Sequence, residues 1–187
     1  TVAASDIKLP TQGAKVAAAV LKAASGAGAS ATPEYCKVSL QIASVDPTAP
    51  PINVQVNLPT NWNQKALHLG GGGWDGVLIT GEGPVPSANA EPTPLSVGYA
   101  TFGSDSGHQA ASVISVEDQV QAFLNDEVMT NYAGAQLKKT HDAALSIIRT
   151  RYGAAPRRTY FAGSSAGGRE ALLVVQRYGD DYDGSIS

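Results

Sequence analysis

Alternating polar and apolar residues indicate two neighbouring β-strands in the first third of the chain. Residues 36–42 and residues 52–58 place apolar side chains at about every second position, and a proline-rich turn at residues 46–51 separates them. Such alternation is typical of strands that bury one face and expose the other. We therefore expect these segments to form an antiparallel pair.

Short apolar segments recur farther along the chain. Residues 66–69 and 99–103 have the composition of strands, residues 159–162 form an aromatic, β-prone run, and residues 184–186 resemble the start of another strand. Residues 80–94 are rich in proline and glycine and are expected to form a loop. Strands that alternate with helices predict a parallel sheet, which here follows the antiparallel pair.

Two segments show the period of amphipathic helices. Residues 136–152 form the clearer one, which Gly153 caps and which Pro156 prevents from continuing. Residues 170–178 predict about three further turns, with Gly179 as the C-cap. The apolar face of the first helix is expected to carry Leu137, His141, Ala144, Leu145, Ile148 and Tyr152.

The beginning of the chain differs in composition from the rest. Residues 1–32 are rich in alanine, serine and glycine, and we expect an extended or partly helical N-terminal lead-in with a flexible joint at residues 26–31. Residues 33–187 are expected to form one domain or part of one. The chain opens on Thr1 rather than methionine, so we expect a processed or trimmed product from which any signal peptide has gone.

Composition and charge argue against several classes of partner. The net charge of −3 gives no electrostatic footprint for nucleic acid, and no apolar run reaches the length of a membrane span. We therefore expect neither nucleic acid nor a membrane as a partner. Cys36 is the single cysteine, so the chain cannot form an internal disulfide.

The most informative stretch is residues 159–168, a short strand that runs into a turn and then a helix. Gly163 and Gly167 flank Ser165 at two positions before and two positions after, which is the G-x-S-x-G pattern. Small neighbours let the chain turn sharply and hold the serine hydroxyl above the strand end, so Ser165 is a candidate nucleophile. The alternative is an ordinary strand–helix joint whose glycines only permit close packing. Ser164 is the rival hydroxyl, and we expect it to point back toward the sheet.

A second glycine-rich segment, residues 70–76, follows a predicted strand. Gly71, Gly73 and Gly76 have the spacing of a dinucleotide-binding loop, but proline and glycine follow where that motif requires a helix. The functional alternative is a loop that presents a free backbone N–H toward Ser165. Together with the N–H of Ala166, such a group would form an oxyanion hole. A glycine-rich turn without a role also remains open.

A serine nucleophile needs a base, and none of the three histidines is convincing. His141 lies on an apolar helical face, and His68 lies inside a strand. His108 and Asp105 form an inviting dyad on a loop, but we expect both to be structural. In the α/β-hydrolase arrangement the acid and the histidine follow the serine along the chain, and the turn after the last helix comes too early to supply the acid. That turn contains Asp180, Asp181 and Asp183.

Several segments together resemble the tannase and feruloyl esterase family of α/β-hydrolases. The most specific is Ser165-x-Gly-Gly-Arg, followed by Gln-Arg-Tyr at residues 176–178 and Tyr-Asp-Gly at residues 182–184. This resemblance implies the N-terminal portion of an α/β-hydrolase fold, up to the nucleophile elbow and the following helix. It also implies that Ser165 is the nucleophile and that the amides of Gly73 and Ala166 form the oxyanion hole. The matching segments are residues 33–38, 58–63, 70–76, 98–108 and 160–183.

The resemblance also implies parts that lie beyond Ser187. The family has a large lid domain, often calcium-binding, and then the catalytic acid and histidine. No metal or cofactor site is expected within this chain. The family usually carries cysteine directly before the nucleophile, where this chain has Ser164.

The sequence and the resemblance together predict a secreted or periplasmic serine carboxylic-ester hydrolase. Its expected substrate is a small ester of an aromatic or phenolic acid, cleaved through an acyl-enzyme. We expect the C-terminal remainder of the hydrolase as a second polypeptide, and we expect this chain alone to be neither active nor stably folded. The alternatives are a non-catalytic binding protein on a hydrolase scaffold and an esterase or depolymerase for aliphatic esters.

Overall fold

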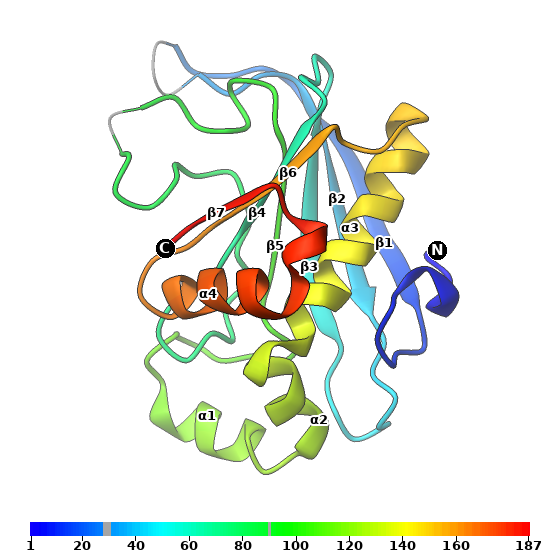
Figure 1. Ribbon diagram of the computed structural model, residues 1–187, viewed down its shortest axis with the longest axis vertical. Coiled ribbons are helices and arrows are strands. Elements are labelled where there is room, and N and C mark those ends of the chain that lie inside the picture. Colours follow the sequence, from blue (N-terminus) through cyan, green and yellow to red (C-terminus); the bar gives the residue numbers. More distant parts are fainter. Residues whose placement is uncertain (28–30, 90) are drawn as a thin grey trace.

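A computed structural model describes residues 1–27, 31–89 and 91–187. Its centre is one mixed sheet, in which the strand order among the described residues is β1-β2-β3-β5-β4-β6-β7 (Figure 1). The strands are β1 (Ala14–Lys22), β2 (Tyr35–Ile42), β3 (Ile52–Pro59), β4 (Lys65–Leu69), β5 (Ala100–Ser104), β6 (Arg158–Ala162) and β7 (Gly184–Ile186).

The sheet has an antiparallel part and a parallel part. The pairs β1–β2, β2–β3 and β3–β5 are antiparallel, whereas β4 is parallel to β5 and β6, and β6 is parallel to β7. The prediction of a parallel sheet that follows an antiparallel pair is confirmed. Parallel strands end at one edge of a sheet, so the loops after β4 and β6 come out side by side.

The N-terminal segment is part of this sheet. The predicted lead-in of residues 1–32 contains β1, an edge strand that pairs with β2 along its length. Alanine-rich segments lack the contrast between polar and apolar positions that identifies a strand, so the sequence did not predict β1 as a sheet strand. The predicted joint at residues 26–31 lies in part outside the described residues, although Ser25 and Thr32 pair through their backbones.

Two long helices lie against the sheet (Figure 1). α3 (Gln136–Tyr152) packs against β2, β3 and β5, and α4 (Ala166–Tyr178) packs against β6 and β7. α3 has the predicted bounds and ends at Gly153, which has the expected left-handed conformation with φ 70°. Gly179 is different, because its φ of −57° is right-handed and it continues into the 3-10 helix η4 (Gly179–Asp181). Gly179 is nevertheless the C-cap of α4, as predicted.

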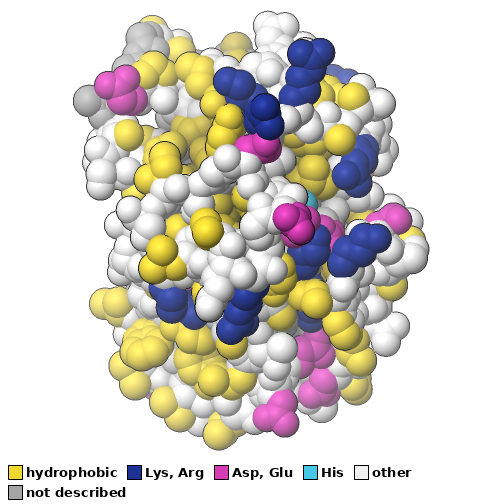
Figure 2. Space-filling model, in the orientation of Figure 1, with side chains coloured by type: hydrophobic (Ala, Val, Ile, Leu, Met, Phe, Trp, Pro, Cys, Tyr) yellow, Lys and Arg dark blue, Asp and Glu magenta, His cyan; other side chains and the backbone are white. Residues whose placement is uncertain are grey.

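Two shorter helices precede α3 and were not predicted. They are α1 (Val116–Ala122) and α2 (Asp126–Thr130), and a π-helical segment (Asn131–Ala135) joins α2 to α3. Val116 is 66% exposed and Val120 is 54% exposed, so α1 shows no buried apolar stripe. Hydrophobic side chains gather on the surface over the region of α1 in Figure 2.

The core lies mainly on one face of the sheet, the face that carries both α3 and α4, and a smaller cluster around Leu67 lies on the opposite face. The main cluster lies between α3 and the strands β2, β3 and β5, and it includes Phe102, Ala144 and Ile148. A second cluster under α4 joins Phe161 to Val174. Burial of these faces holds β6 and α4 rigidly in place, and the connection between them is the segment that contains Ser165.

Candidate active site

The connection between β6 and α4 places Ser165 in a strained backbone conformation. β6 ends at Ala162 and α4 begins at Ala166, and Ser165 between them has φ 58° and ψ −121°. A non-glycine residue in such a region costs about 1–3 kcal/mol, which the surrounding structure must offset. Ser165 is exposed, and no described residue forms a hydrogen bond with its hydroxyl. Ser164 is exposed as well, so the expectation that it turns back toward the sheet is wrong.

The two flanking glycines are required by close backbone contacts. A Cβ on Gly163 would lie 2.2 Å from the carbonyl oxygen of Gly167. A Cβ on Gly167 would lie 2.7 Å from the carbonyl oxygen of Gly71. Close packing and a sharp turn at the serine are thus produced by the same pair of residues, so the two interpretations of the motif do not exclude each other.

The glycine-rich loop that follows β4 lies against the start of α4. The N–H of Gly70 donates to the carbonyl oxygen of Ala162 at 2.9 Å, and the N–H of Gly167 donates to the carbonyl oxygen of Gly71 at 3.1 Å. Among the described residues no helix follows this loop before α1, so the geometry of a dinucleotide-binding unit is absent there. The loop instead lines the edge of the sheet at which Ser165 is exposed.

Two backbone N–H groups near this edge have no partner. Among the described residues, none accepts a hydrogen bond from the N–H of Gly73 or from the N–H of Ala166. Ala166 is the first residue of α4, where helix geometry leaves N–H groups free and favours negative charge. Gly73 has φ 58°, and a Cβ there would lie 2.3 Å from the carbonyl oxygen of Val113. Both amides are available to an anion.

A buried carboxylate, Glu170, lies behind the glycine loop and was missed by the sequence analysis. Its Oε2 accepts a hydrogen bond from the N–H of Gly71 at 2.8 Å, and its Oε1 accepts one from Nε2 of Gln136 at 2.8 Å. Burial, together with the negative charge of Asp75, raises the pKa of Glu170 to about 7. A signal did exist, because a charged residue four positions before the buried Val174 falls on the apolar stripe of the helix.

A second buried acid lies on the glycine loop itself. Asp75 is 2% exposed, and its Oδ2 is 3.8 Å from Nη2 of Arg169. Burial raises the pKa of Asp75, while the charges of Arg169 and His108 oppose that rise. The guanidinium of Arg169 stacks over the ring of Tyr132 at 4.4 Å and donates to its carbonyl oxygen at 3.2 Å. The residue after Gly168 in the family motif therefore connects α4 to the loop and to the π-helical segment.

The structure does not join Asp105 and His108 into a dyad. Asp105 accepts hydrogen bonds from the N–H groups of Asn53 and Gly107, whereas Nε2 of His108 lies 3.1 Å from the carbonyl oxygen of Trp74. Because a carbonyl only accepts, Nε2 of His108 must carry the proton. Both side chains are almost fully buried. That the pair supports the loops rather than the chemistry stays a prediction.

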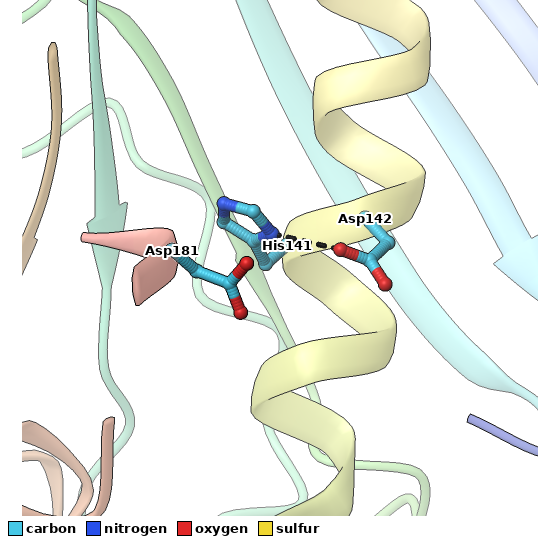
Figure 3. Close-up of side chains that lie close together, drawn as sticks. All are labelled: His141, Asp142 and Asp181. Atoms are coloured by element: carbon cyan, nitrogen blue, oxygen red, sulfur yellow. Dashed lines mark hydrogen bonds and ion pairs between the residues drawn. The ribbon is translucent and has the colours of Figure 1, made fainter. Parts of the chain in front are cut away.

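His141 is a packed histidine, as predicted (Figure 3). Its Nδ1 is 2.9 Å from Oδ1 of Asp142, and its ring lies 5.0 Å from the ring of Tyr182. His141, Asp142 and Asp181 are close enough together to hold a metal ion. However, Nζ of Lys138 is 2.9 Å from Asp142 and 2.8 Å from Asp181, so an ammonium group already compensates the two carboxylates.

The remaining candidates also lie away from Ser165. Nδ1 of His68 is 2.8 Å from the hydroxyl of Tyr182, and burial lowers the pKa of His68 well below its usual value. Asp183 accepts a hydrogen bond from the N–H of Thr159 and pairs with Arg158, at the opposite end of β6 from Ser165. Among the described residues, no histidine is hydrogen-bonded to the candidate nucleophile.

The fold and the comparisons with known proteins together define the class. Residues 36–187 match the family described as tannase and feruloyl esterase. The chain also superposes on the crystal structure of feruloyl esterase B from Aspergillus oryzae with a TM-score of 0.72 and 22% identity, covering 96% of this chain and 34% of that one. The architecture is the N-terminal portion of an α/β-hydrolase fold.

Proteins with similar sequences point to the same family. The chain is 45% identical, over its whole length and 33% of the relative, to an uncharacterized esterase from Agrobacterium fabrum. It is 29% identical to the mono(2-hydroxyethyl) terephthalate hydrolase of Piscinibacter sakaiensis, over 86% of this chain and 27% of that protein. The chain belongs to the tannase and feruloyl esterase family. It spans between about a quarter and a third of the length of these relatives.

Two further observations concern the described residues only. No helix in that part of the chain has both the length and the apolar character needed to cross a membrane. Cys36 is a free thiol within it.

Proposed function

We propose that the chain carries the nucleophile and the oxyanion hole of a serine carboxylic-ester hydrolase. The observation that carries this proposal is the strained backbone of Ser165, which exposes a hydroxyl next to the unpaired N–H of Ala166, on an edge of the sheet where the glycine loop with the unpaired N–H of Gly73 packs against α4. A turn of this kind between a strand and a helix is typical of the nucleophile elbow. Strain of this size at an exposed serine supports a functional rather than a structural role.

The proposed reaction proceeds through an acyl-enzyme. Ser165 Oγ attacks the ester carbonyl carbon while a base takes the hydroxyl proton, and the carbonyl oxygen becomes an oxyanion that accepts from the amides of Gly73 and Ala166. Collapse of this intermediate breaks the bond to the alkoxy group, which leaves with a proton. Water then attacks the acyl-enzyme, releases the acid and restores the hydroxyl.

The proposed substrates are esters of aromatic or phenolic acids. Support comes from the names of the relatives, which include a hydrolase of mono(2-hydroxyethyl) terephthalate and a probable feruloyl esterase B-2 from Aspergillus flavus that is 27% identical over 83% of this chain. We further propose that the enzyme is secreted or periplasmic. The calcium-binding lid implied by the family resemblance stays a prediction.

We propose that the acid and the base come from the remainder of the hydrolase, which packs beside β7. Ile186 of β7 is 63% exposed, and β7 has no second strand partner within the described residues. A cavity of about 480 Å³ lies next to this strand, and its walls include Tyr99, Tyr160 and Ile186. An apolar parallel edge of this kind is normally covered.

The proposal is tested with a fluorophosphonate probe on the complete enzyme. We expect the probe to label wild type and Ser164→Ala equally, and Ser165→Ala not at all. Ser164→Ala is the matched control because it removes an equally exposed neighbouring hydroxyl. Labelling that survives in Ser165→Ala would contradict the proposal, as would absence of labelling and of ester turnover in wild type, which would favour a binding protein.

A further inference from the structure

Glu170 connects the two backbone segments that carry the proposed oxyanion amides. It lies one helical turn after Ala166, and side chains on a helix lean back toward its N-terminus. Through Oε2 it accepts from the N–H of Gly71, while the carbonyl oxygen of Gly71 accepts from the N–H of Gly167. Both polar groups of Gly71 are therefore held by α4, two residues before Gly73.

The carboxylate is itself fixed from the opposite side. Oε1 of Glu170 accepts from Nε2 of Gln136, and Oε1 of Gln136 accepts from the hydroxyl of Ser104 at 2.8 Å. Gln136 begins α3 and Ser104 ends β5, so the contact reaches two further elements. Glu170 is only 1% exposed, and a Cβ on Gly70 would lie 2.8 Å from its Oε2. The carboxylate is therefore enclosed on both sides, with each oxygen held by a hydrogen bond.

Glu170 places a carboxyl group in a buried position where a neutral side chain would cost less free energy to bury. Within the described residues Glu170 has no ion pair closer than 4 Å, and the buried Asp75 adds a second negative charge nearby. Burial of an acid without a paired cation is unfavourable. A carboxylate offers two acceptor oxygens and no donor, which suits the two N–H donors that face it, from Gly71 and Gln136.

We propose that Glu170 is a positioning residue for the oxyanion hole. It holds the glycine loop against the start of α4, so that the N–H groups of Gly73 and Ala166 point to the same developing oxyanion. This inference rests on the proposed function of Ser165. Partners that orient metal ligands in the same indirect way change activity about 10–100-fold when they are replaced, and we expect an effect of this size for Glu170.

The test compares Glu170→Gln with Glu127→Gln in the complete enzyme. Glutamine keeps the shape of Glu170 but turns an NH₂ group toward Gly71 or Gln136, where two donors would then face each other. Glu127 is the control, because it likewise accepts hydrogen bonds through both carboxylate oxygens, from the backbone amides of Asp46 at 2.7 Å and Val45 at 3.3 Å and from Nζ of Lys139 at 3.1 Å. It belongs to α2 and contacts neither the glycine loop nor α4 through these bonds.

For Glu170→Gln we expect kcat to fall about 10–100-fold while KM changes less than about threefold. An arylboronic acid forms a tetrahedral adduct with a serine nucleophile, and its affinity should fall by the same factor as kcat/KM. Glu127→Gln should lower the melting temperature and leave both quantities unchanged. Wild-type kcat and boronate affinity in a folded Glu170→Gln protein would overturn the proposal.

A second variant covers the case in which Glu170→Gln does not fold. Gln136→Met removes the hydrogen bond from Gln136 to Glu170 but leaves the one from Gly71. We therefore expect kcat to fall about 3–10-fold, less than in Glu170→Gln. Unchanged kcat and boronate affinity in this variant would then overturn the proposal. The proposed function fails separately, through ester turnover that persists in Ser165→Ala.

Discussion

The two ends of β6 differ in whether their polar groups have hydrogen-bond partners. At its N-terminal end, polar groups are paired: Asp183 accepts from the N–H of Thr159 and forms an ion pair with Arg158. At its C-terminal end, Ser165 is strained and the N–H groups of Gly73 and Ala166 have no partner among the described residues. Among the described residues, the polar groups at one end of β6 are thus hydrogen-bonded, whereas those at the other end are free. Polar groups left free at a rigid position are what a reaction intermediate can use.

The two ends of β6 also differ in the direction in which the pKa values of their acidic residues are shifted. Asp183 is exposed to solvent in part, and hydrogen bonds from Thr159 and Arg158 lower its pKa. At the other end burial raises the pKa of Asp75 and raises that of Glu170 to about 7. Carboxyl groups with raised pKa values cluster at functional sites more often than elsewhere. The comparison therefore supports the proposal that the functional site lies at the C-terminal end of β6.

The largest expected effect comes from filling the tight contact at the C-terminal end. Gly163→Ala would place a Cβ 2.2 Å from the carbonyl oxygen of Gly167, so the backbone of the elbow must shift. We expect a loss of more than about 3 kcal/mol in the free energy of unfolding, or failure to fold. Gly153→Ala is the control, because Gly153 has positive φ but an added Cβ meets nothing within 4 Å, and it should cost about 1 kcal/mol. Urea unfolding measures both variants. Equal losses of unfolding free energy in Gly163→Ala and Gly153→Ala would contradict the claim that the C-terminal end of β6 requires a close backbone contact.

The next effect concerns pH. The pKa of Glu170 is raised from its usual 4.5 to about 7, so the folded protein holds this proton more tightly than the unfolded chain does. The group therefore contributes stability that is fully present below pH 4.5 and is lost as pH rises through 7.

The measurement is the free energy of unfolding between pH 4.5 and pH 7, the two ends of that shift, in wild type and Glu170→Gln. Asp75 also has a raised pKa and acts in the same direction, and its charge repels that of Glu170, so the difference between the two proteins reports Glu170 together with this repulsion. The decrease with rising pH should be smaller in Glu170→Gln. Identical slopes would show that Glu170 does not titrate in this range.

His108→Gln should affect stability more than chemistry. The variant loses the contact between Nε2 of His108 and the carbonyl oxygen of Trp74, and loss of such a hydrogen bond costs about 0.5–1.5 kcal/mol. We expect kcat to stay within about threefold of wild type, because the residue supports the loop rather than the proton transfer. A loss of kcat comparable to that of Ser165→Ala would identify His108 as the base.

The smallest expected effect lies at the N-terminal end of β6. Arg158 is 61% exposed, and an exposed ion pair contributes about 0–1 kcal/mol. Arg158→Met should therefore change the unfolding free energy by less than about 1 kcal/mol and leave ester turnover unchanged. A large loss of turnover in this variant would contradict the assignment of that end of β6 to structure alone.

Regular patterns made much of the fold predictable. Alternation identified β2 and β3, and a helical period with Gly153 at its end identified α3 with its bounds. β1 was not predicted as a sheet strand, because its alanines give no contrast between faces. α1 was missed because its apolar side chains, such as Val116 and Val120, point to solvent rather than to the core.

Features of the candidate site that depend on neighbouring residues were predictable from the sequence, and contacts between distant residues were not. The spacing of Gly163, Ser165 and Gly167 indicates a sharp turn from three neighbouring positions. The bond between Gly71 and Glu170 joins residues 99 positions apart, and no pattern within either segment encodes it. Contacts of this kind depend on the sheet order, in which β4 and β6 become neighbours although β5 lies between them in the chain.

The most direct test of the central claim is to trap the acyl-enzyme on the complete protein. Rapid acid quenching during turnover of an aromatic ester, followed by tryptic digestion, yields the peptide of residues 159–169, which contains both Ser164 and Ser165. Fragmentation mass spectrometry then assigns the modified residue. The account predicts the mass of the aromatic acyl group on Ser165. The same mass on Ser164, or on any residue outside this peptide, would contradict it.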